Sequence, residues 1–193
     1  MGMPKTETHW TAKMVRALPD DGKRYELVSG ELVVTPAPAP LHQKLLTALI
    51  RQIDSYLQQI GSGRLLPSPA DLAFGEDEIL QPDLFVLPAS LRPQFSAWSE
   101  VTSLLLAVEI LSPSTARYDR IVKRRRYQRA GIPEYWIVDP DARVVERWRP
   151  SDERPEVVSE ILEWRPMAGS PPLLVDLPAL FAEGWGERVG GAG

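Results

Sequence analysis

The sequence predicts an α/β (α+β) protein in which a mixed β-sheet is flanked by helices. Three observations support this fold class. Residues 41–61 carry apolar side chains at helical spacing. Residues 104–111 are almost continuously apolar, as in a strand covered on both faces. A second helical pattern at 117–131 leads into an apolar strand at 134–139, which indicates a crossover between parallel strands.

The composition is that of one soluble globular domain. The chain has 193 residues, of which 44% are hydrophobic and 25% are charged. It contains no cysteine, which excludes disulfides and thiolate–metal sites and suits a reducing compartment. It shows no signal-peptide region and no apolar run of bilayer length, so we expect a cytoplasmic protein without membrane contact. We expect a single domain at 10–183, with flexible termini at 1–9 and 184–193.

The charge of the chain is unevenly distributed. The net charge of −4 argues against a protein that coats nucleic acid by bulk charge. Residues 117–129, however, hold seven Lys or Arg against one acid, Asp119. This segment could present a basic face to a polyanion, although a solvated helix face is the plainer interpretation.

Two helices and a proline-rich connector are predicted in the first third of the chain. Thr11 is a suitable N-cap for a short helix at 11–18. The connector at 35–40 contains too many prolines for a helix or a central strand. The longer helix at 41–61 follows it and stops at Gly61.

A β-hairpin is predicted at residues 24–34, where two apolar runs flank Ser29 and Gly30. If these two residues form the loop, Val28 faces Glu31 and Glu26 faces Val33 across the hairpin. Glu26 and Glu31 then share one face as diagonal neighbours. The usual interpretation of such a pair is a solvated face.

Further strands are expected along the rest of the chain. They lie within residues 63–75, 83–88, 104–111, 134–139, 142–150 and around 160–166. A short helix is expected at 177–184. Turn residues at 112–115 and 139–141 separate the neighbouring elements.

Two carboxylates stand beside apolar strands. Asp83 opens the strand at 83–88, and Glu109 lies near the end of the strand at 104–111. Burying an isolated carboxylate costs several kcal/mol or more unless it is paired. If these strands are neighbours, the two groups converge at one sheet edge, where Mg²⁺ or Mn²⁺ would relieve their repulsion. The alternatives are a turn residue for Asp83 and a water-facing edge position for Glu109.

The helix after the Glu109 strand supplies a cation. Asp119, Lys123 and Tyr127 lie along one face at helical spacing. A metal that binds a phosphodiester also activates a water, and this chemistry benefits from a further cation near the phosphate. Lys123 is the candidate, and the alternative is an ordinary ion pair with Asp119.

Several motifs occur together in one order. They are QPD ending at Asp83, EILSPS beginning at Glu109, the pair Asp119 and Lys123 before Tyr127, and GIPEYWIVD at 131–139. With YELVSGELV upstream, His42 after the connector and LPALF near the end, the chain resembles the PD-(D/E)XK nucleases. Within them it resembles the Uma-type restriction endonucleases, over about residues 10 to 183.

This resemblance implies an αβββαβ restriction-endonuclease-like core, here with an added N-terminal helix and hairpin, that cleaves DNA with Mg²⁺. Asp83 and Glu109 take the places of the two motif acids. The motif would put a lysine two residues after Glu109, where this chain has Leu111. In families of this type the lysine can come from the following helix instead, which would make it Lys123. The main-chain carbonyl of Ile110 is a further metal ligand by this resemblance.

Secondary and DNA-contacting residues complete the hypothesis. Glu31 could bind a second metal or orient water, His42 could have a role in the site, and Asp119 would orient its neighbours. Tyr127 most simply packs, with a hydroxyl near the phosphate as the alternative. Backbone phosphates would meet the basic helix at Arg117, Arg120 and Arg124. A homodimer would suit cutting a duplex.

Two other functions compete with this one. The first is a nuclease fold without chemistry that acts as a nucleic-acid-binding or assembly module, which Leu111 in the lysine position favours. The second treats Asp83 and Glu109 as the acid and base of a glycoside hydrolase. No sugar-binding aromatic residues cluster near them in the sequence, which disfavours that function.

Overall fold

The structure is a computed structural model that describes residues 9–19, 21–75, 78–91 and 95–187. The termini expected to be flexible were 1–9 and 184–193, and residues 1–8 and 188–193 of these lie outside the described residues. The helices are α1 (Ala12–Arg16), α2 (Pro40–Ile60), the 3₁₀ turn η1 (Trp98–Glu100), α3 (Ala116–Tyr118), the π-helical segment η2 (Asp119–Lys123), α4 (Arg124–Arg129) and α5 (Leu177–Trp185). The strands are β1 (Arg24–Val28), β2 (Glu31–Thr35), β3 (Arg64–Pro67), β4 (Glu78–Ile79), β5 (Leu84–Leu87), β6 (Leu106–Ile110), β7 (Tyr135–Asp139), β8 (Val144–Trp148), β9 (Glu156–Val158), β10 (Ile161–Trp164) and β11 (Leu173–Asp176).

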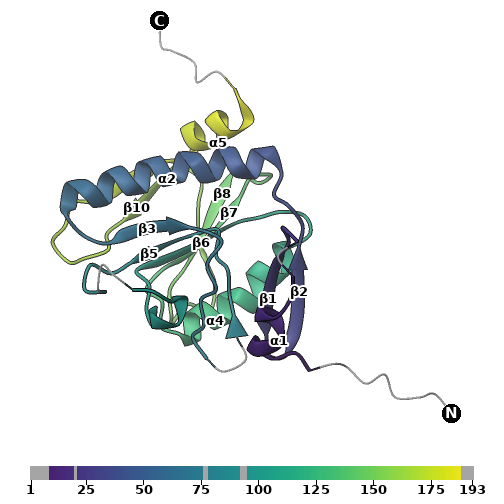
Figure 1. Ribbon diagram of the computed structural model, residues 1–193. Helices are drawn as coiled ribbons and strands as arrows, with labels where there is room; N and C mark the ends of the chain where they lie inside the picture. The colour runs from purple at the N-terminus through teal and green to yellow at the C-terminus, as the bar shows by residue number, and fades with distance from the viewer. Residues whose placement is uncertain (1–8, 20, 76–77, 92–94, 188–193) are drawn as a thin grey trace, which may run out of the picture.

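A six-stranded mixed sheet forms the centre of the molecule, with the strand order β3-β5-β6-β7-β8-β9 (Figure 1). β6 and β7 are parallel, and the other neighbouring strands are antiparallel. The helical run α3–η2–α4 connects the two parallel strands, as such a pair requires. The predicted fold class, a mixed sheet flanked by helices, is confirmed.

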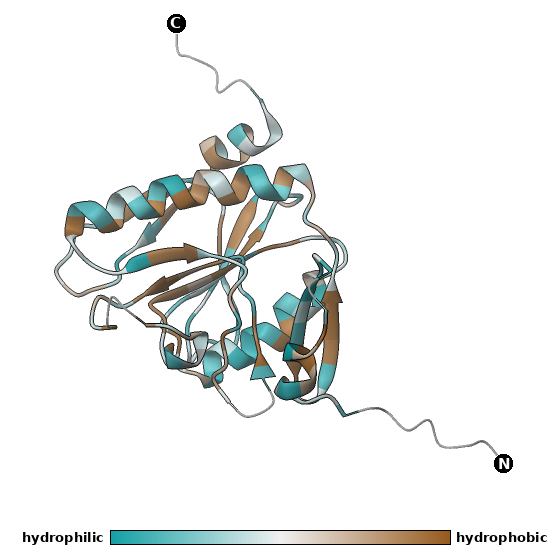
Figure 2. Cartoon of the chain, in the orientation of Figure 1, coloured by the Kyte–Doolittle hydropathy of each residue, from teal (hydrophilic) through white to brown (hydrophobic). Residues whose placement is uncertain are grey.

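Two hydrophobic cores lie on opposite faces of this sheet. Successive strand residues point to opposite faces, so Val108 packs toward α2 and α5 while Ala107 packs toward α4. Figure 2 shows the apolar strands between the helices and the polar residues along the outer side of α2. By the same alternation, Asp83 and Glu109 belong to the face that carries α4.

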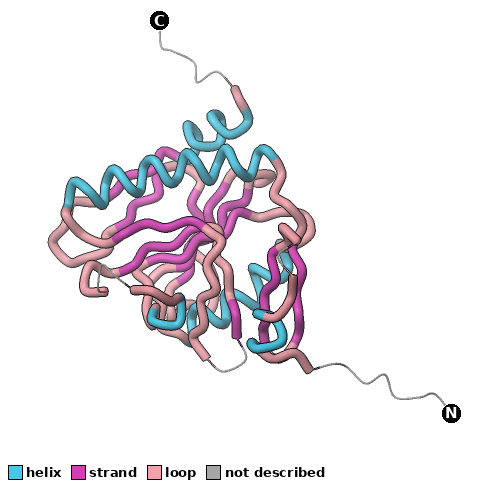
Figure 3. Tube along the Cα trace, viewed as in Figure 1, coloured by secondary structure: helices cyan, strands magenta, loops and turns pink. Residues whose placement is uncertain are grey.

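The hairpin β1–β2 forms with the predicted register, in which Glu26 pairs with Val33 and Val28 with Glu31. Ser29 and Gly30 have φ values of 53° and 80°, the left-handed conformation that a tight two-residue turn needs. β4 adds a third strand on the other side of β1. The tube view in Figure 3 shows this small sheet beside the central one.

The helix boundaries follow local chemistry. The Thr11 hydroxyl caps α1 by accepting from the Met14 amide at 3.2 Å. Gly61 ends α2 with a φ of 63°, a conformation that glycine adopts without strain. Within the described residues, no helix is long and apolar enough to cross a membrane.

Some elements differ from the prediction. β4, β9 and β11 were not predicted, because each has only two to four residues and β11 directly follows prolines. α5 runs to Trp185, past the predicted domain end at residue 183. Gly184 is buried in α5, and an added Cβ there would meet the Leu45 side chain at 2.5 Å, so α5 packs closely on α2.

Candidate active site

Asp83 lies at the sheet edge immediately before β5, and its side chain is held on both oxygens. One oxygen, Oδ1, accepts from the Arg24 guanidinium at 2.7 Å. The other, Oδ2, accepts from the Ile110 amide at 2.8 Å and lies 2.9 Å from His42 Nε2. These contacts fix a carboxylate that is only 3% exposed.

Glu109 lies on the neighbouring strand, β6. Because Leu84 pairs with Val108, Asp83 and Glu109 come opposite each other one step further along the ladder. Glu109 is 3% exposed and points toward the α4 side of the sheet. The expected convergence of the two strands, and with it of the two carboxylates, is therefore present.

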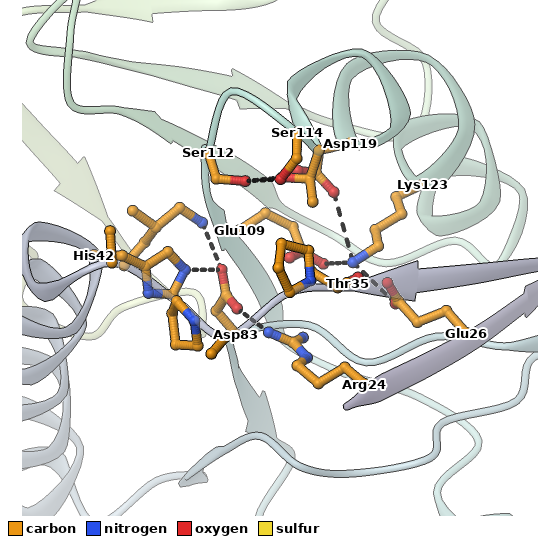
Figure 4. Close-up of a pocket in the computed structure, with 16 residues that line it drawn as sticks. Arg24, Glu26, Thr35, His42, Asp83, Glu109, Ser112, Ser114, Asp119 and Lys123 are labelled. Atoms are coloured by element: carbon orange, nitrogen blue, oxygen red, sulfur yellow. Dashed lines mark hydrogen bonds and ion pairs between the residues drawn. The ribbon is translucent and has the colours of Figure 1, made fainter. Parts of the chain in front are cut away.

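Lys123 reaches back from the helix to Glu109. Its ammonium Nζ lies 2.8 Å from Glu109 Oε1 and 2.9 Å from Glu26 Oε1. Asp119 Oδ1 is farther away, at 3.5 Å. The geometry therefore disfavours the alternative of an ordinary ion pair with Asp119, because Glu109 and Glu26 lie nearer to the ammonium. Figure 4 shows the ammonium between the three carboxylates.

A π-helical segment places Asp119 and Lys123. The predicted regular helix is instead interrupted by η2, which spans these two residues and separates α3 from α4. Both side chains are buried, at 2% exposure each. Single π turns inside α-helices occur often at functional sites. This one carries both charged side chains to the inner face of the helix, where the pocket lies.

The electrostatics of the site depart from those of free side chains. Burial raises the pKa of Glu109 well above its usual value; Lys123 opposes this shift, and the carboxylates of Asp83, Asp119 and Glu26 add to it. Burial would lower the pKa of Lys123, but the carboxylates of Glu109, Glu26 and Asp119 raise it well above normal, so its ammonium stays charged. Burial alone would raise the pKa of Asp83, but its contacts with His42 and Arg24 hold it well below the usual range.

These groups line a small pocket of about 120 Å³. Its acidic and basic lining residues are Glu26, Asp83, Glu109 and Asp119 with Arg24, His42 and Lys123. Four residues with hydroxyl groups, Thr35, Ser112, Ser114 and Thr115, also line the pocket. The volume is suited to a phosphate group with a few waters.

The donor set fits a hard divalent cation. Within the described residues, no group of three or more His, Cys, Asp or Glu is gathered closely enough to hold a metal. Mg²⁺ needs less than that, because it commonly takes one or two carboxylates together with waters and substrate phosphate. Burial raises the pKa of Glu109, and Asp83, Asp119 and Glu26 raise it further, so a cation bound beside these carboxylates would favour the ionised form. Asp119 Oδ1 is also buried without a hydrogen-bond partner.

Two residues of the site were missed or ranked low by sequence reasoning. Arg24 was not considered, yet it binds Asp83. The sequence offered Glu31 as a second metal ligand and gave Glu26 no role in the site, but Glu26 is buried and lines the pocket while Glu31 is exposed. A signal for both was the alternation of β1, which puts residues 24 and 26 on the same face.

The other candidate residues of the site lie at or beside the pocket. His42 lies in the first turn of α2 and contacts Asp83, and Asp119 lines the pocket. The Tyr127 hydroxyl lies 3.5 Å from Glu109 Oε1, and its ring is buried in the core on the α4 side. Ile110 lines the pocket and donates its amide to Asp83.

The three arginines expected to meet DNA phosphates differ in their surroundings. Arg120 is bound to Asp139 at 2.6 Å and to Glu146 at 2.7 Å. Arg124 lies over the Trp148 ring, 4.5 Å from its centre, and donates to Gln128. Arg117 is exposed and has no ion-pair partner in the described part of the chain. These contacts hold two of the three guanidinium groups against the protein itself.

Comparisons with known proteins agree with the geometry. A family model described as Uma2, "Putative restriction endonuclease", matches residues 12–178. A crystal structure described as "a putative nuclease belonging to DUF820" from Anabaena variabilis ATCC 29413 is similar to this chain with a TM-score of 0.76. The two are 22% identical over 91% of this chain and 99% of that one, so the likeness concerns the fold. No curated protein matches.

Proposed function

The chain belongs to the Uma2 family, which is described as "Putative restriction endonuclease", and on that premise we propose that it is a divalent-metal-dependent endonuclease that hydrolyses phosphodiester bonds in DNA. One observation carries the proposal. The Lys123 ammonium lies 2.8 Å from Glu109, beside Asp83 on the adjacent strand. A buried cation and two carboxylates, Glu109 in β6 and Asp83 directly before β5, thus line one pocket, although Leu111 occupies the position of the motif lysine.

Each side chain has a role in this proposal. Asp83 and Glu109 would hold Mg²⁺ or Mn²⁺, with the Ile110 carbonyl as a further ligand. When bound, the metal would polarise the phosphate and lower the pKa of an attacking water. Lys123 keeps its charge at neutral pH and would stabilise the negative charge that develops on the phosphate.

The residues around Asp83 act on its orientation. Arg24 and His42 hold its two oxygens, and the low pKa of Asp83 keeps the carboxylate ionised and ready to bind a cation. Arg24 also stands at the pocket wall, where a guanidinium could contact a phosphate oxygen. These contacts support a preformed site over one assembled only on binding.

The test is cleavage of supercoiled plasmid in Mg²⁺ or Mn²⁺, with EDTA and the Asp83→Ala variant as controls. We expect nicked or linear plasmid from the wild-type protein and a loss of at least about 100-fold in both controls. Lys123→Met, which keeps the length of the side chain and removes the charge, should lose a similar factor. Calorimetric titration with Mn²⁺ measures binding to the same site independently of cleavage.

Failure to cut in either metal would refute the nuclease proposal for plasmid DNA. If Mn²⁺ then binds neither the wild-type protein nor any variant, the metal site is refuted as well. DNA binding that persists in EDTA without any cutting would support the alternative, a nuclease fold that acts as a binding or assembly module.

A further inference from the structure

Glu109 would have two cations to hold during the proposed reaction. Its carboxylate would bind the divalent metal, and its Oε1 atom lies 2.8 Å from the Lys123 ammonium. Two positive charges on one carboxylate repel each other, so a bound metal would weaken the attraction between Glu109 and Lys123. The ammonium therefore needs a second partner if it is to stay beside the phosphate.

Glu26 is placed to be that second partner. Its Oε1 atom lies 2.9 Å from the Lys123 ammonium, and the two residues are 1% and 2% exposed. Figure 4 shows the Glu26 carboxylate directed at the ammonium. A buried ion pair of this kind is screened little by solvent and salt, so it can hold the ammonium without the charge of Glu109.

The Glu26 carboxylate is itself held in place by the main chain around it. It lies in the middle of β1, where Glu26 pairs with Val33 in the hairpin. Its Oε1 atom also accepts from the main-chain amide of Gln81 at 2.7 Å. The Gln81 side chain in turn donates to Asp71 at 2.7 Å. Glu26 can therefore keep its position when the other partners of the ammonium change.

The other groups around the ammonium are weaker partners. Asp119 Oδ1 is 3.5 Å away, which is longer than a normal hydrogen bond. The centre of the Tyr118 ring lies 5.8 Å from the ammonium, near the limit for a cation–π contact. Among the residues that the structure describes, Glu26 and Glu109 are thus the two carboxylates within hydrogen-bonding distance of Lys123.

We propose that Glu26 is a positioning residue that retains the Lys123 ammonium when a divalent cation draws on the charge of Glu109. The inference rests on the proposed function for the presence of that cation. It gives Glu26 no contact with the metal or the phosphate, because Glu26 acts through Lys123. The hairpin β1–β2 thereby contributes to the site a carboxylate that stays with the lysine.

NMR measures the state of the ammonium with neither DNA nor cleavage. In protein that carries isotope-labelled lysine, a buried and hydrogen-bonded ammonium gives an N–H signal, because its hydrogens exchange slowly with water. Exposed ammonium groups exchange too fast to give one. Lys123→Met lacks the group and therefore identifies the signal of Lys123.

Glu109→Gln in EDTA imitates the loss of the Glu109 charge to a metal. We expect the Lys123 signal to persist in this variant and to vanish in Glu26→Gln/Glu109→Gln. Glutamine at position 26 keeps an oxygen that can accept from the Gln81 amide, so the hairpin should remain in place. Glu31→Gln/Glu109→Gln is the matched control, because Glu31 is an exposed glutamate of the same hairpin, and it should keep the signal.

Mg²⁺ provides a second measurement that needs only single variants. With saturating Mg²⁺ the wild-type protein should keep the Lys123 signal, and Glu26→Gln should lose it. This comparison decides the role of Glu26 if the double variant does not fold. If Mg²⁺ changes neither spectrum, the variants in EDTA decide it.

The outcomes separate this role from the nuclease proposal. Loss of the signal in Glu109→Gln, or in the wild-type protein with Mg²⁺, would overturn the role of Glu26. A signal that survives in Glu26→Gln/Glu109→Gln would overturn it as well. A signal that is lost only when both glutamates are changed, in a protein that cuts no DNA with either metal, would support Glu26 as the partner of the ammonium and refute the nuclease proposal.

Discussion

Glu109 carries a carboxylate that is costly to keep ionised where it lies. It is 3% exposed, and Glu26 and Asp119 add negative charge near the single ammonium of Lys123. Its pKa is accordingly raised well above the usual value. Asp83 has the opposite character, because His42 and Arg24 lower its pKa despite its burial. The two acids of the site should therefore affect stability with opposite signs.

Glu109→Gln should stabilise the protein at neutral and alkaline pH while abolishing metal-dependent cleavage. An acid with a raised folded-state pKa loses stability as pH rises above its unfolded value of 4.5, because ionisation costs more in the folded protein. The variant removes that cost, by about 1 kcal/mol at pH 8. Its gain should fade as pH falls toward 4.5. Urea unfolding between pH 5 and 8 measures it, and a loss of stability at pH 8 would contradict the argument.

Asp83→Asn is the matched comparison and should destabilise the protein by about 2 kcal/mol. The lowered pKa of Asp83 means that its contribution is fully present above its unfolded value of 3.8 and is lost as pH falls below it. The loss in Asp83→Asn should therefore be constant across pH 5 to 8. A loss that changes with pH in this range would mean that Asp83 titrates there.

Sequence reasoning could identify some of these residues and not others. Asp83 and Glu109 were detectable because each stands out beside an apolar strand. For Arg24 and Glu26 the alternation of β1 indicates only that the two residues share a face, and their place in the site depends on how the hairpin packs against β5 and the helix. The sequence pattern of the hairpin predicts its register, but not which other elements it packs against.

At the scale of elements, η2 determines whether Lys123 can reach Glu109. A π turn contains one residue more than an α turn for the same advance, which changes the direction of the side chains before and after it. The spacing of Asp119 and Lys123 is four residues in either helix type, so spacing could not distinguish them. The sequence predicted a helical run here, but not the π turn within it, whose residues include Lys123.

Deletion of Ile121 should convert this helical run into a regular helix and uncouple the lysine from the site. Ile121 lies within η2 and is 41% exposed, so its loss removes little core packing. A displacement of the ammonium by about 1 Å can cost about 100-fold in rate. We expect that loss in the plasmid assay, with helix content retained by circular dichroism.

Ile121→Ala serves as its control, because it trims the same side chain and keeps the chain length. It should cut plasmid at nearly the wild-type rate. If the deletion variant folds and remains fully active, η2 has no part in positioning Lys123.

At the scale of the whole molecule, the central sheet separates one large hydrophobic core from the pocket of the candidate active site. The core between the sheet and α2, α5 and β10–β11 contains none of the pocket carboxylates, which belong to the other side or the sheet edge. His42, in the first turn of α2, is the link between the two sides. The overall order of strands and helices was predictable for this reason, since it depends on apolar patterns that extend over whole elements.

Leu180→Ala tests this division. Leu180 lies in α5 at 1% exposure, and its truncation should lower the free energy of unfolding by about 2–5 kcal/mol. Metal-dependent cleavage by the folded variant at 20 °C should stay within about twofold of wild type. A folded Leu180→Ala protein with a large loss of activity would show that the α5 core controls the site.

The placement of the ammonium on a helix, instead of two residues after Glu109, affects how this chain can evolve. Leu111 packs in the core on the α4 side, and the proposed reaction assigns it no role. That position can drift among apolar residues under selection for packing alone, while selection on chemistry acts on the helix. If Lys123 is the cation of the proposed reaction, lineages that share this arrangement can diverge at position 111 without losing that cation.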